Sequence, residues 1–146
     1  MREVAQELRS AIEEAMPRLR ALDEASAARP RATGKWCSKE ILGHLVDSAA
    51  NNHQRFLRVQ LASELVFPGY QQDEWVARQG YRDRAWVETL DLWQRLNGHL
   101  AHLIERLPES DRTKTLRIGD QPPSPLEWWV RDYVRHLRHH LAQILG

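Results

Sequence analysis

Residues 124–144 read SPLEWWVRDYVRHLRHHLAQI and contain the clearest helical pattern of the chain. Ser124 is typical of a helix N-cap, Pro125 fits the first helical position, and Glu127 at the third position completes a capping box. We therefore predict that a helix begins at this motif and continues through these residues. At 100° per residue, its apolar face consists of Val130, Leu137, Leu141 and Ile144. A helix with one such face is expected to pack lengthwise against other helices.

Three further amphipathic patterns occupy residues 2–28, 37–61 and 83–107, and no stretch alternates as a strand does. Pro17 should kink or interrupt the first of these helices. Cys37 stands at the cap position of the second, but a thiol is a poor acceptor, so Ser38 is an alternative cap. Residues 62–82 should form a loop with one short helix, and residues 108–123 a surface excursion. The chain is thus predicted to be all-α, a four-helix bundle forming a single domain over residues 1–146.

The composition argues against several classes of protein. Hydrophobic residues make up 42% of the 146 and charged residues 28%, which is ordinary for a globular protein. The 21 Lys and Arg balance 20 Asp and Glu, and the two signs are interspersed, so we expect no nucleic-acid partner. Cys37 is the only cysteine, which excludes an internal disulfide. There is no signal-peptide pattern and no apolar run of about 18 residues, so we expect a cytoplasmic protein that does not enter the membrane.

Three of the seven histidines lie close together in the last predicted helix. On the helical wheel, His136 and His140 form an i, i+4 pair along one edge of the apolar face, whereas His139 points to water. Two imidazoles at this spacing can bind one metal ion, but two ligands are seldom enough. A third ligand is therefore expected from another helix.

The second predicted helix offers that third imidazole. Ser48, Asn51 and Arg55 fall within about 40° of His44 and form a polar stripe bordered by apolar residues, whereas His53 lies on the opposite face. Three neutral imidazoles leave one coordination position open, as in catalytic metal sites. The plainer interpretation, that each histidine is a hydrogen-bonded structural residue, stays open.

Several other polar residues are candidates for a pocket beside these histidines. Asn51, Arg55 and Tyr133 are predicted to line it, and Arg55 could bind an anionic group of a substrate or cofactor. Asp47 is either a carboxylate that supports the site or an exposed residue. Asn97 could reach the pocket, or it could make a hydrogen bond between two helices.

Two more pairs of residues have less specific roles. Asp73 and Trp75 could cover the mouth of the pocket; alternatively, Asp73 is the N-cap of a short helix and Trp75 a core residue. His99 and His102 have no partner at i+4 and are expected to face solvent.

The stretches GKWCSKEILGHLVDSAANNHQRF (34–56), YQQDEWV (70–76) and DYVRHLRHHLAQI (132–144) resemble the DinB/YfiT-like family of small bacterial proteins. The resemblance covers nearly the whole chain and implies an up-down-down-up four-helix bundle with a metal site between helices. It also implies that His44, His136 and His140 are the ligands, that the metal is nickel or zinc, and that homodimers are common. Cys37 departs from the family, which usually has Ser or Thr there; this affects the helix cap and not the ligands.

The family implies an activity only in broad terms, because its members include thiol S-transferases, thiol-dependent isomerases and proteins called metal-dependent hydrolases. Our first hypothesis is a metal-dependent enzyme of the transferase or hydrolase type, with a small-molecule substrate and a low-molecular-weight thiol as a further cofactor. The alternative is a non-catalytic, stress-related bundle that binds a metal or a ligand. A third hypothesis, a helical interaction module with structural histidines, predicts no stoichiometric metal.

Overall fold

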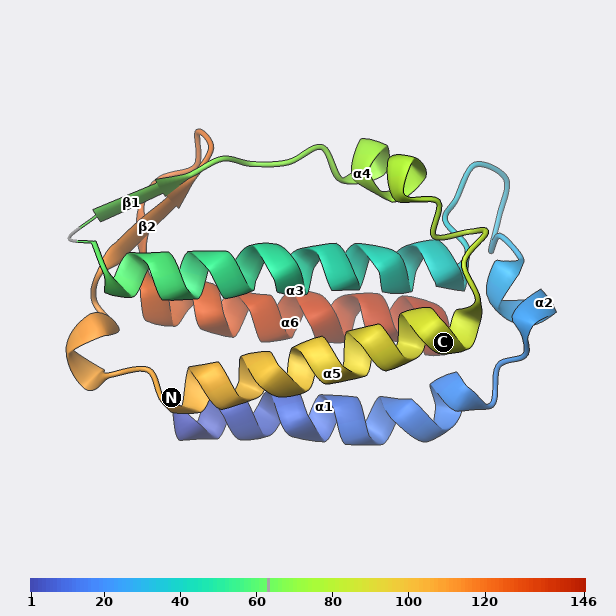
Figure 1. Cartoon of the computed structure of the whole chain (residues 1–146), viewed down its shortest axis with the longest axis horizontal. Helices are drawn as coiled ribbons and strands as arrows, with labels where there is room; N and C mark the ends of the chain where they lie inside the picture. Colours follow the sequence, from blue (N-terminus) through green and yellow to red (C-terminus); the bar gives the residue numbers. More distant parts are fainter. Residues whose placement is uncertain (63) are drawn as a thin grey trace.

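The computed structural model describes residues 1–62 and 64–146, and its main body is a bundle of four long helices (Figure 1). These are α1 (Arg2–Arg20), α3 (Ser38–Gln60), α5 (Trp86–Glu105) and α6 (Leu126–Leu145). α1 and α6 run in one direction and α3 and α5 in the other, so the order along the chain is up-down-down-up (Figure 1). The predicted four-helix bundle is confirmed.

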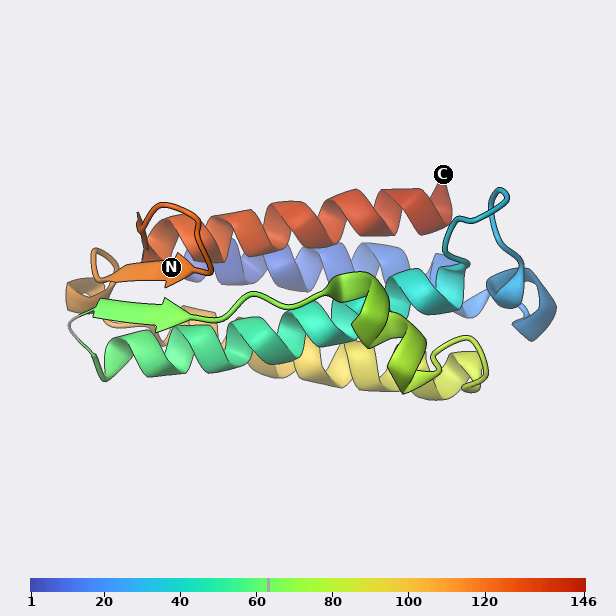
Figure 2. The ribbon, with the colours of Figure 1, turned by 90° about the horizontal axis from the view of Figure 1, so that it is seen from above.

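The order of the helices around the bundle differs from their order in the chain. α1 and α3 each pack on both α5 and α6, so α1 and α3 lie diagonally opposite each other. Because α3 and α5 are parallel neighbours, the chain must return along the whole bundle between them. That return contains β1 (Glu64–Phe67) and α4 (Gln72–Gln79), and it runs above α3 (Figure 2). This connection therefore adds a layer over α3, and the small sheet also contacts α6.

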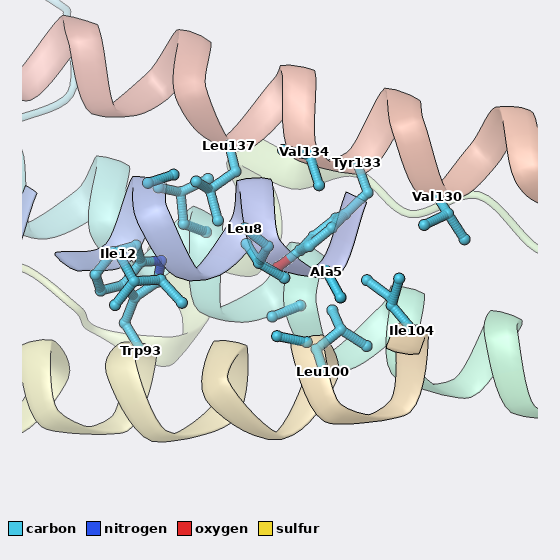
Figure 3. Packing of buried hydrophobic residues seen from close by; sticks show 14 of the residues in the cluster. Ala5, Leu8, Ile12, Trp93, Leu100, Ile104, Val130, Tyr133, Val134 and Leu137 are labelled. Carbon is cyan, nitrogen blue, oxygen red and sulfur yellow. The ribbon is translucent and has the colours of Figure 1, made fainter. Parts of the chain in front are cut away.

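The core is built from side chains that repeat every three or four residues on each helix. Figure 3 shows Leu8 and Ile12 of α1, Trp93 and Leu100 of α5, and Leu137 of α6 meeting in the centre. All five are buried. Removing each large apolar side chain from water stabilises the fold by about 1.5–3 kcal/mol. This packing sets the spacing and rotation of the helices, and hence the positions of the polar side chains among them.

The expectation that no strand would form is wrong. β1 pairs in parallel with β2 (Thr115–Ile118), and β2 pairs in antiparallel fashion with the two-residue β3 (Ser124–Pro125). Strands this short do not produce a recognisable alternation of apolar and polar residues. Trp129 of α6 donates its Nε1–H to the carbonyl of Leu116 at 2.8 Å, which fixes the small sheet against the bundle.

The first predicted helix, residues 2–28, is two helices. α1 continues through Pro17, which lies in its last turn, and the break comes after Arg20. α2 (Glu24–Ala28) begins at Asp23, whose carboxylate accepts a hydrogen bond from the backbone N–H of Ser26 at 2.7 Å. The break thus comes from a new N-cap and not from the proline.

Two predicted caps also need correction. Cys37, and not Ser38, is the N-cap of α3, and the Cys37 backbone N–H donates to the carboxylate of Glu40 at 2.9 Å. α6 begins after Pro125, because Ser124 belongs to β3 and is not the cap. Pairing with β2 thus takes the place of the expected capping box at the start of α6.

The remaining connections are short. α5 begins three residues later than predicted from the sequence pattern and ends at Glu105; the segment that follows holds one turn of 3₁₀ helix, η1 (Glu109–Asp111), before β2. Among the described helices, not one combines the length and the apolar character that a membrane crossing requires.

Candidate functional site

Three imidazoles meet between α3 and α6. His44 projects from α3, and His136 and His140 come from successive turns of α6. One ring nitrogen of each lies within 4.8 Å of the other two, and the Nε2 atoms of His44 and His136 are 3.2 Å apart. The three ring centroids are separated by 5.1, 4.8 and 4.5 Å. The structure therefore brings together the three histidines that the sequence analysis selected.

Burial keeps these imidazoles in the neutral form. His44 is 2% exposed, and loss of hydration lowers its pKa to about 3, with the neighbouring His140 and His136 adding to the shift. Loss of hydration likewise lowers the pKa of His136 to about 4 and lowers the pKa of His140 below its ordinary value. A neutral imidazole has a lone pair that can bind a metal ion, which an imidazolium lacks. The cluster is therefore ready to bind a cation at neutral pH.

The donor set fits a divalent transition metal. Two nitrogens bound to one tetrahedral zinc ion lie about 3.3 Å apart, close to the separation of the Nε2 atoms of His44 and His136. His140 donates its Nδ1–H to Oε1 of Gln143 at 2.8 Å, which leaves Nε2 as the ligand atom. Within residues 1–62 and 64–146, the buried Nδ1 atoms of His44 and His136 have no hydrogen-bond partner. Three neutral ring nitrogens within 4.8 Å of one another are thus a donor set that a divalent metal ion can bind.

Two cavities reach the histidines. The larger, of about 550 Å³, is lined by His140 and by the loop that precedes α3. The smaller, of about 280 Å³, is lined by His44 and His136 and extends to Arg55. Gln72, in the first turn of α4, lines both cavities. The cluster can thus be reached from two directions.

The polar stripe of α3 is divided between two environments. Ser48, Asn52 and Arg55 line the smaller cavity together with residues of α6. Asn51, predicted to line the pocket, instead donates its amide to the carbonyl of Asp47 at 2.9 Å and is not among the lining residues. Asn51 and Asp47 lie on the edge of the stripe that the segment after α4 covers. The hydrogen bond from the Tyr81 hydroxyl to Asp47 shows this contact. Helix angles do not show which edge of a stripe a later segment covers.

Asp47 is a buried carboxylate, so its predicted exposed alternative is wrong. It is 4% exposed, and its Oδ1 accepts hydrogen bonds from the Tyr81 hydroxyl at 2.8 Å and from Nε2 of Gln79 at 2.7 Å. Burial raises its pKa even though both hydrogen bonds act in the opposite direction. The Tyr81 ring lies where a side chain at Gly43 would be, since a Cβ there would be 2.2 Å from the ring. Gly43 thus lets the chain after α4 pack directly on α3.

Tyr133 lines the smaller cavity but is held by a buried partner. Its hydroxyl donates to Oδ1 of Asn97, and the amide of Asn97 donates to the carbonyl of Trp93 at 2.9 Å. Asn97 is fully buried. Of the two alternatives for Asn97, the structure therefore shows the hydrogen bond between helices, here between α5 and α6.

The other histidines are not part of this group of donors, although the ring of His139 packs beside that of His140 with centroids 5.2 Å apart. His139, His99 and His102 are exposed, as expected. His53, predicted to be on the surface, is half-buried, and its ring centroid is 5.3 Å from that of His99. In the part of the chain that the structure describes, this pair has no third donor beside it.

The short helix α4 corrects two further expectations. Its N-cap is Gln71, so Asp73 is not the cap but lies in the first turn, where it lines the larger cavity. Trp75 is 40% exposed and packs beside Tyr70, with ring centroids 4.7 Å apart, so it is not a core residue.

Sequence reasoning missed several residues of the site. Gln143 lies three residues after His140 on the same face of α6, and that spacing was a usable signal. Asn52 was missed because it lies at the edge of the stripe. Tyr70, in the connection between β1 and α4, and Gln72, the first residue of α4, line the smaller cavity. They had no sequence signal, because the path of a connection is decided only when the bundle forms.

Comparison with known sequences identifies relatives over most of the chain. The model of the DinB superfamily matches residues 7–144. A protein of Halalkalibacterium halodurans named "Putative metal-dependent hydrolase" is 24% identical over 123 residues, which are 84% of this chain and 71% of that protein. A protein of Bacillus cereus with the same name is 24% identical over 139 residues, covering 95% of this chain and 80% of the relative.

Solved structures with the same fold include two of interest. YfiT from Bacillus subtilis, described as a probable metal-dependent hydrolase with an unusual four-helix bundle topology, has a TM-score of 0.84 at 22% identity, covering 98% of this chain and 81% of YfiT. A mycothiol-dependent maleylpyruvate isomerase has a TM-score of 0.80 at 15% identity, covering 99% of this chain and 60% of the isomerase. Identities this low establish the fold alone. The family model, in contrast, covers the chain from the first helix to the last, and the chain belongs to the DinB superfamily.

Proposed function

We propose that this protein is a metal-dependent enzyme that acts on a small molecule, with His44, His136 and His140 binding one divalent ion. The observation that carries the proposal is the group of three neutral imidazole nitrogens within 4.8 Å of one another beside a cavity. When bound, the ion would supply Lewis acidity, which generates a nucleophile at neutral pH. Imidazole ligands suit both nickel and zinc, and we propose either as the metal.

The chain's own residues would position this chemistry. Gln143 holds His140 in one tautomer and orientation through its hydrogen bond to Nδ1. The walls of the smaller cavity, which include Arg55 and Tyr133, would bind and orient the substrate. Loss of hydration at His44 and His136 keeps these rings unprotonated, so that their nitrogens can bind the ion.

Within this proposal, transfer from a low-molecular-weight thiol is favoured over hydrolysis. A transferase must hold two molecules at one reacting centre, and two cavities meet at the histidines. The mycothiol-dependent isomerase with the same fold uses a thiol of this kind, which supports the same class of cofactor here. The names of the curated relatives support the hydrolase as the second candidate.

A non-catalytic bundle that binds a metal or a ligand is the alternative, and it would use the same three histidines without turnover. The homodimer and the cytoplasmic location stay predictions of the sequence analysis. Neither affects the test of the metal site, which concerns one chain.

The proposal is tested first by metal content. Protein purified without a histidine tag, incubated with zinc or nickel and then desalted, should contain about one metal ion per chain by elemental analysis. His44→Ala and His136→Ala should each lose it. His53→Ala and His102→Ala are matched controls, because both histidines lie outside the cluster, and these variants should keep the metal.

Activity is tested next, by screening the metal-loaded protein with electrophiles in the presence of cysteine or other small thiols. Turnover that disappears in His44→Ala supports the enzyme. Full metal content with no turnover of thiols, esters or amides would favour the non-catalytic alternative. Absence of metal from the wild-type protein would exclude the metal-dependent enzyme and a metal-binding bundle, and would favour a helical module with structural histidines.

A further inference from the structure

Arg55 is a buried cation without a counter-ion. Its side chain projects from α3 and is 6% exposed. Among the described residues, none of the carboxylates forms an ion pair with it, although eleven other ion pairs are present. An unpaired charge in the interior is costly, so proteins seldom keep one without a use for it.

The partners that Arg55 does have are weak. Its Nη1 lies 3.5 Å from Oδ1 of Asn52, and its guanidinium carbon lies 5.3 Å from the centre of the Phe67 ring. Within residues 1–62 and 64–146, the buried Nε–H has no acceptor. A guanidinium has five N–H donors, and most of them therefore stay available to a ligand.

The guanidinium lines the same cavity as the candidate metal ligands. His44 and Arg55 lie eleven residues apart on one helix, a rise of about 16 Å between their Cα atoms. The side chain of Arg55 turns back toward Asn52, which brings its charge closer to His44 than the Cα spacing indicates. The cavity of about 280 Å³ is thus lined by two of the three clustered imidazoles, those of His44 and His136, and by the cation of Arg55.

The other polar groups of the cavity do not neutralise Arg55. Asp132 also lines it, but its carboxylate is paired with Arg135 on the same helix. Tyr70 faces the cavity as a neutral phenol, because burial raises its pKa to about 12. Asn52 and Tyr70 can add hydrogen bonds to an oxyanion beside the guanidinium.

We propose that Arg55 binds a carboxylate group at the end of an elongated substrate whose reacting group lies at His44, His136 and His140. This inference rests on the proposed function and narrows its substrate class to molecules whose carboxylate is remote from the reacting atom, within the roughly 16 Å that separates the two Cα atoms. A planar guanidinium binds a carboxylate through two parallel hydrogen bonds. A single arginine matches the single charge of a carboxylate better than the double charge of a phosphate monoester.

The first test measures the zinc content of the protein. Calorimetry then compares the affinities of ligands of different length. Zinc-loaded protein is titrated with mercaptoacetate, mercaptopropionate, mercaptohexanoate and mercaptooctanoate, and with mercapto-alcohols of the same lengths. Since thiolates bind zinc well, each probe anchors at the metal end, and only one of suitable length reaches Arg55. We expect one of the longer acids to bind roughly ten- to hundredfold tighter than its alcohol, and mercaptoacetate to show no such advantage.

Two variants show whether Arg55 causes this preference. Arg55→Met keeps the volume of the side chain without its charge and should bind acid and alcohol alike, with unchanged zinc content. Arg58→Met removes an exposed arginine three residues along the same helix and should behave as the wild type. An advantage of the acid that survives in Arg55→Met would overturn the proposal.

A second measurement does not depend on the metal. The thermal midpoint of metal-free wild-type protein should rise in hexanoate but not in hexanol, and Arg55→Met should show no rise. Failure to bind zinc, together with a rise in hexanoate, would contradict the metal proposal and leave the carboxylate site supported. Zinc binding without any preference for the acids, or stabilisation by inorganic phosphate and not by hexanoate, would overturn the carboxylate site alone.

Discussion

The Nε2 atoms of His44 and His136 lie 3.2 Å apart, although 92 residues separate the two histidines in the chain. His44 is buried and His136 half-buried, and neither Nδ1 atom has a hydrogen-bond partner in the described ranges. In the metal-free protein the two Nε2 atoms share one hydrogen bond, which a bound metal ion would replace. The predictions below concern this contact and the residues that support it.

The metal-free protein should lose stability as the pH falls below 6.5. In the unfolded chain His44 and His136 take up protons near pH 6.5, whereas in the folded protein their pKa values are about 3 and about 4. Between these values the unfolded state binds more protons, so the free energy of unfolding decreases as the pH is lowered. Each such proton contributes about 1.4 kcal/mol per pH unit. Urea denaturation in the presence of a chelator, at pH values from 7.5 to about 4, measures this slope.

His44→Phe is the control for this prediction, because it keeps an aromatic ring and removes one titrating group. Its stability should fall less steeply than that of the wild type below pH 6.5, with parallel curves above pH 7. Identical slopes in the two proteins would mean that His44 does not stay neutral in the folded state.

Gln143→Ala should weaken metal binding by roughly ten- to hundredfold without abolishing it. Gln143 accepts the Nδ1–H hydrogen bond of His140, and its loss frees that ring to rotate and to change tautomer. Competition with a zinc indicator measures the affinity. Gln143 also contacts His139, so His139→Ala serves as the control and should bind metal as the wild type does. Equal losses in both variants would show that His139 shares in the effect.

Gly43→Ala should destabilise the fold by about 1–3 kcal/mol, because the new Cβ would lie 2.2 Å from the buried ring of Tyr81. The displacement of Tyr81 would also remove its hydrogen bond to Asp47. The control is Gly98→Ala in α5, where a Cβ meets nothing within 4 Å. That variant should be more stable by about 0.5–1 kcal/mol, since alanine is the better helix former. Relative to the wild type, the denaturation midpoint should fall in Gly43→Ala and rise in Gly98→Ala. Stabilisation of both variants would contradict the packing of Tyr81 on α3.

Tyr133→Phe should cost about 1–3 kcal/mol of stability, because the buried Oδ1 of Asn97 would lose its donor. The double variant Tyr133→Phe/Asn97→Leu removes both partners and should recover part of the loss. Thermal or urea denaturation of the three proteins measures both effects. If the single variant were as stable as the wild type, this hydrogen bond would not hold α5 and α6 together.

Much of this architecture follows from local patterns. The apolar spacing on the four long helices predicted the bundle, because a helix with one apolar face can bury it only against its neighbours. The i, i+4 spacing of His136 and His140 likewise placed two imidazoles on one edge of α6. His44 was selected from its helix angle and agreed with the family resemblance, but its distance from the other two could only be seen in the folded bundle.

The tertiary structure alone decided what covers α3. The return connection between two parallel helices packs on one edge of the polar stripe, so that Asn51 bonds to its own helix and Asp47 to Tyr81. The other edge stays open as a cavity. Pairing between distant segments also decided the short strands, and it placed Ser124 in β3 in place of the predicted helix cap. Periodicity along a sequence records which face of a helix is polar, but it does not record which segment, far away in the chain, comes to lie on that face.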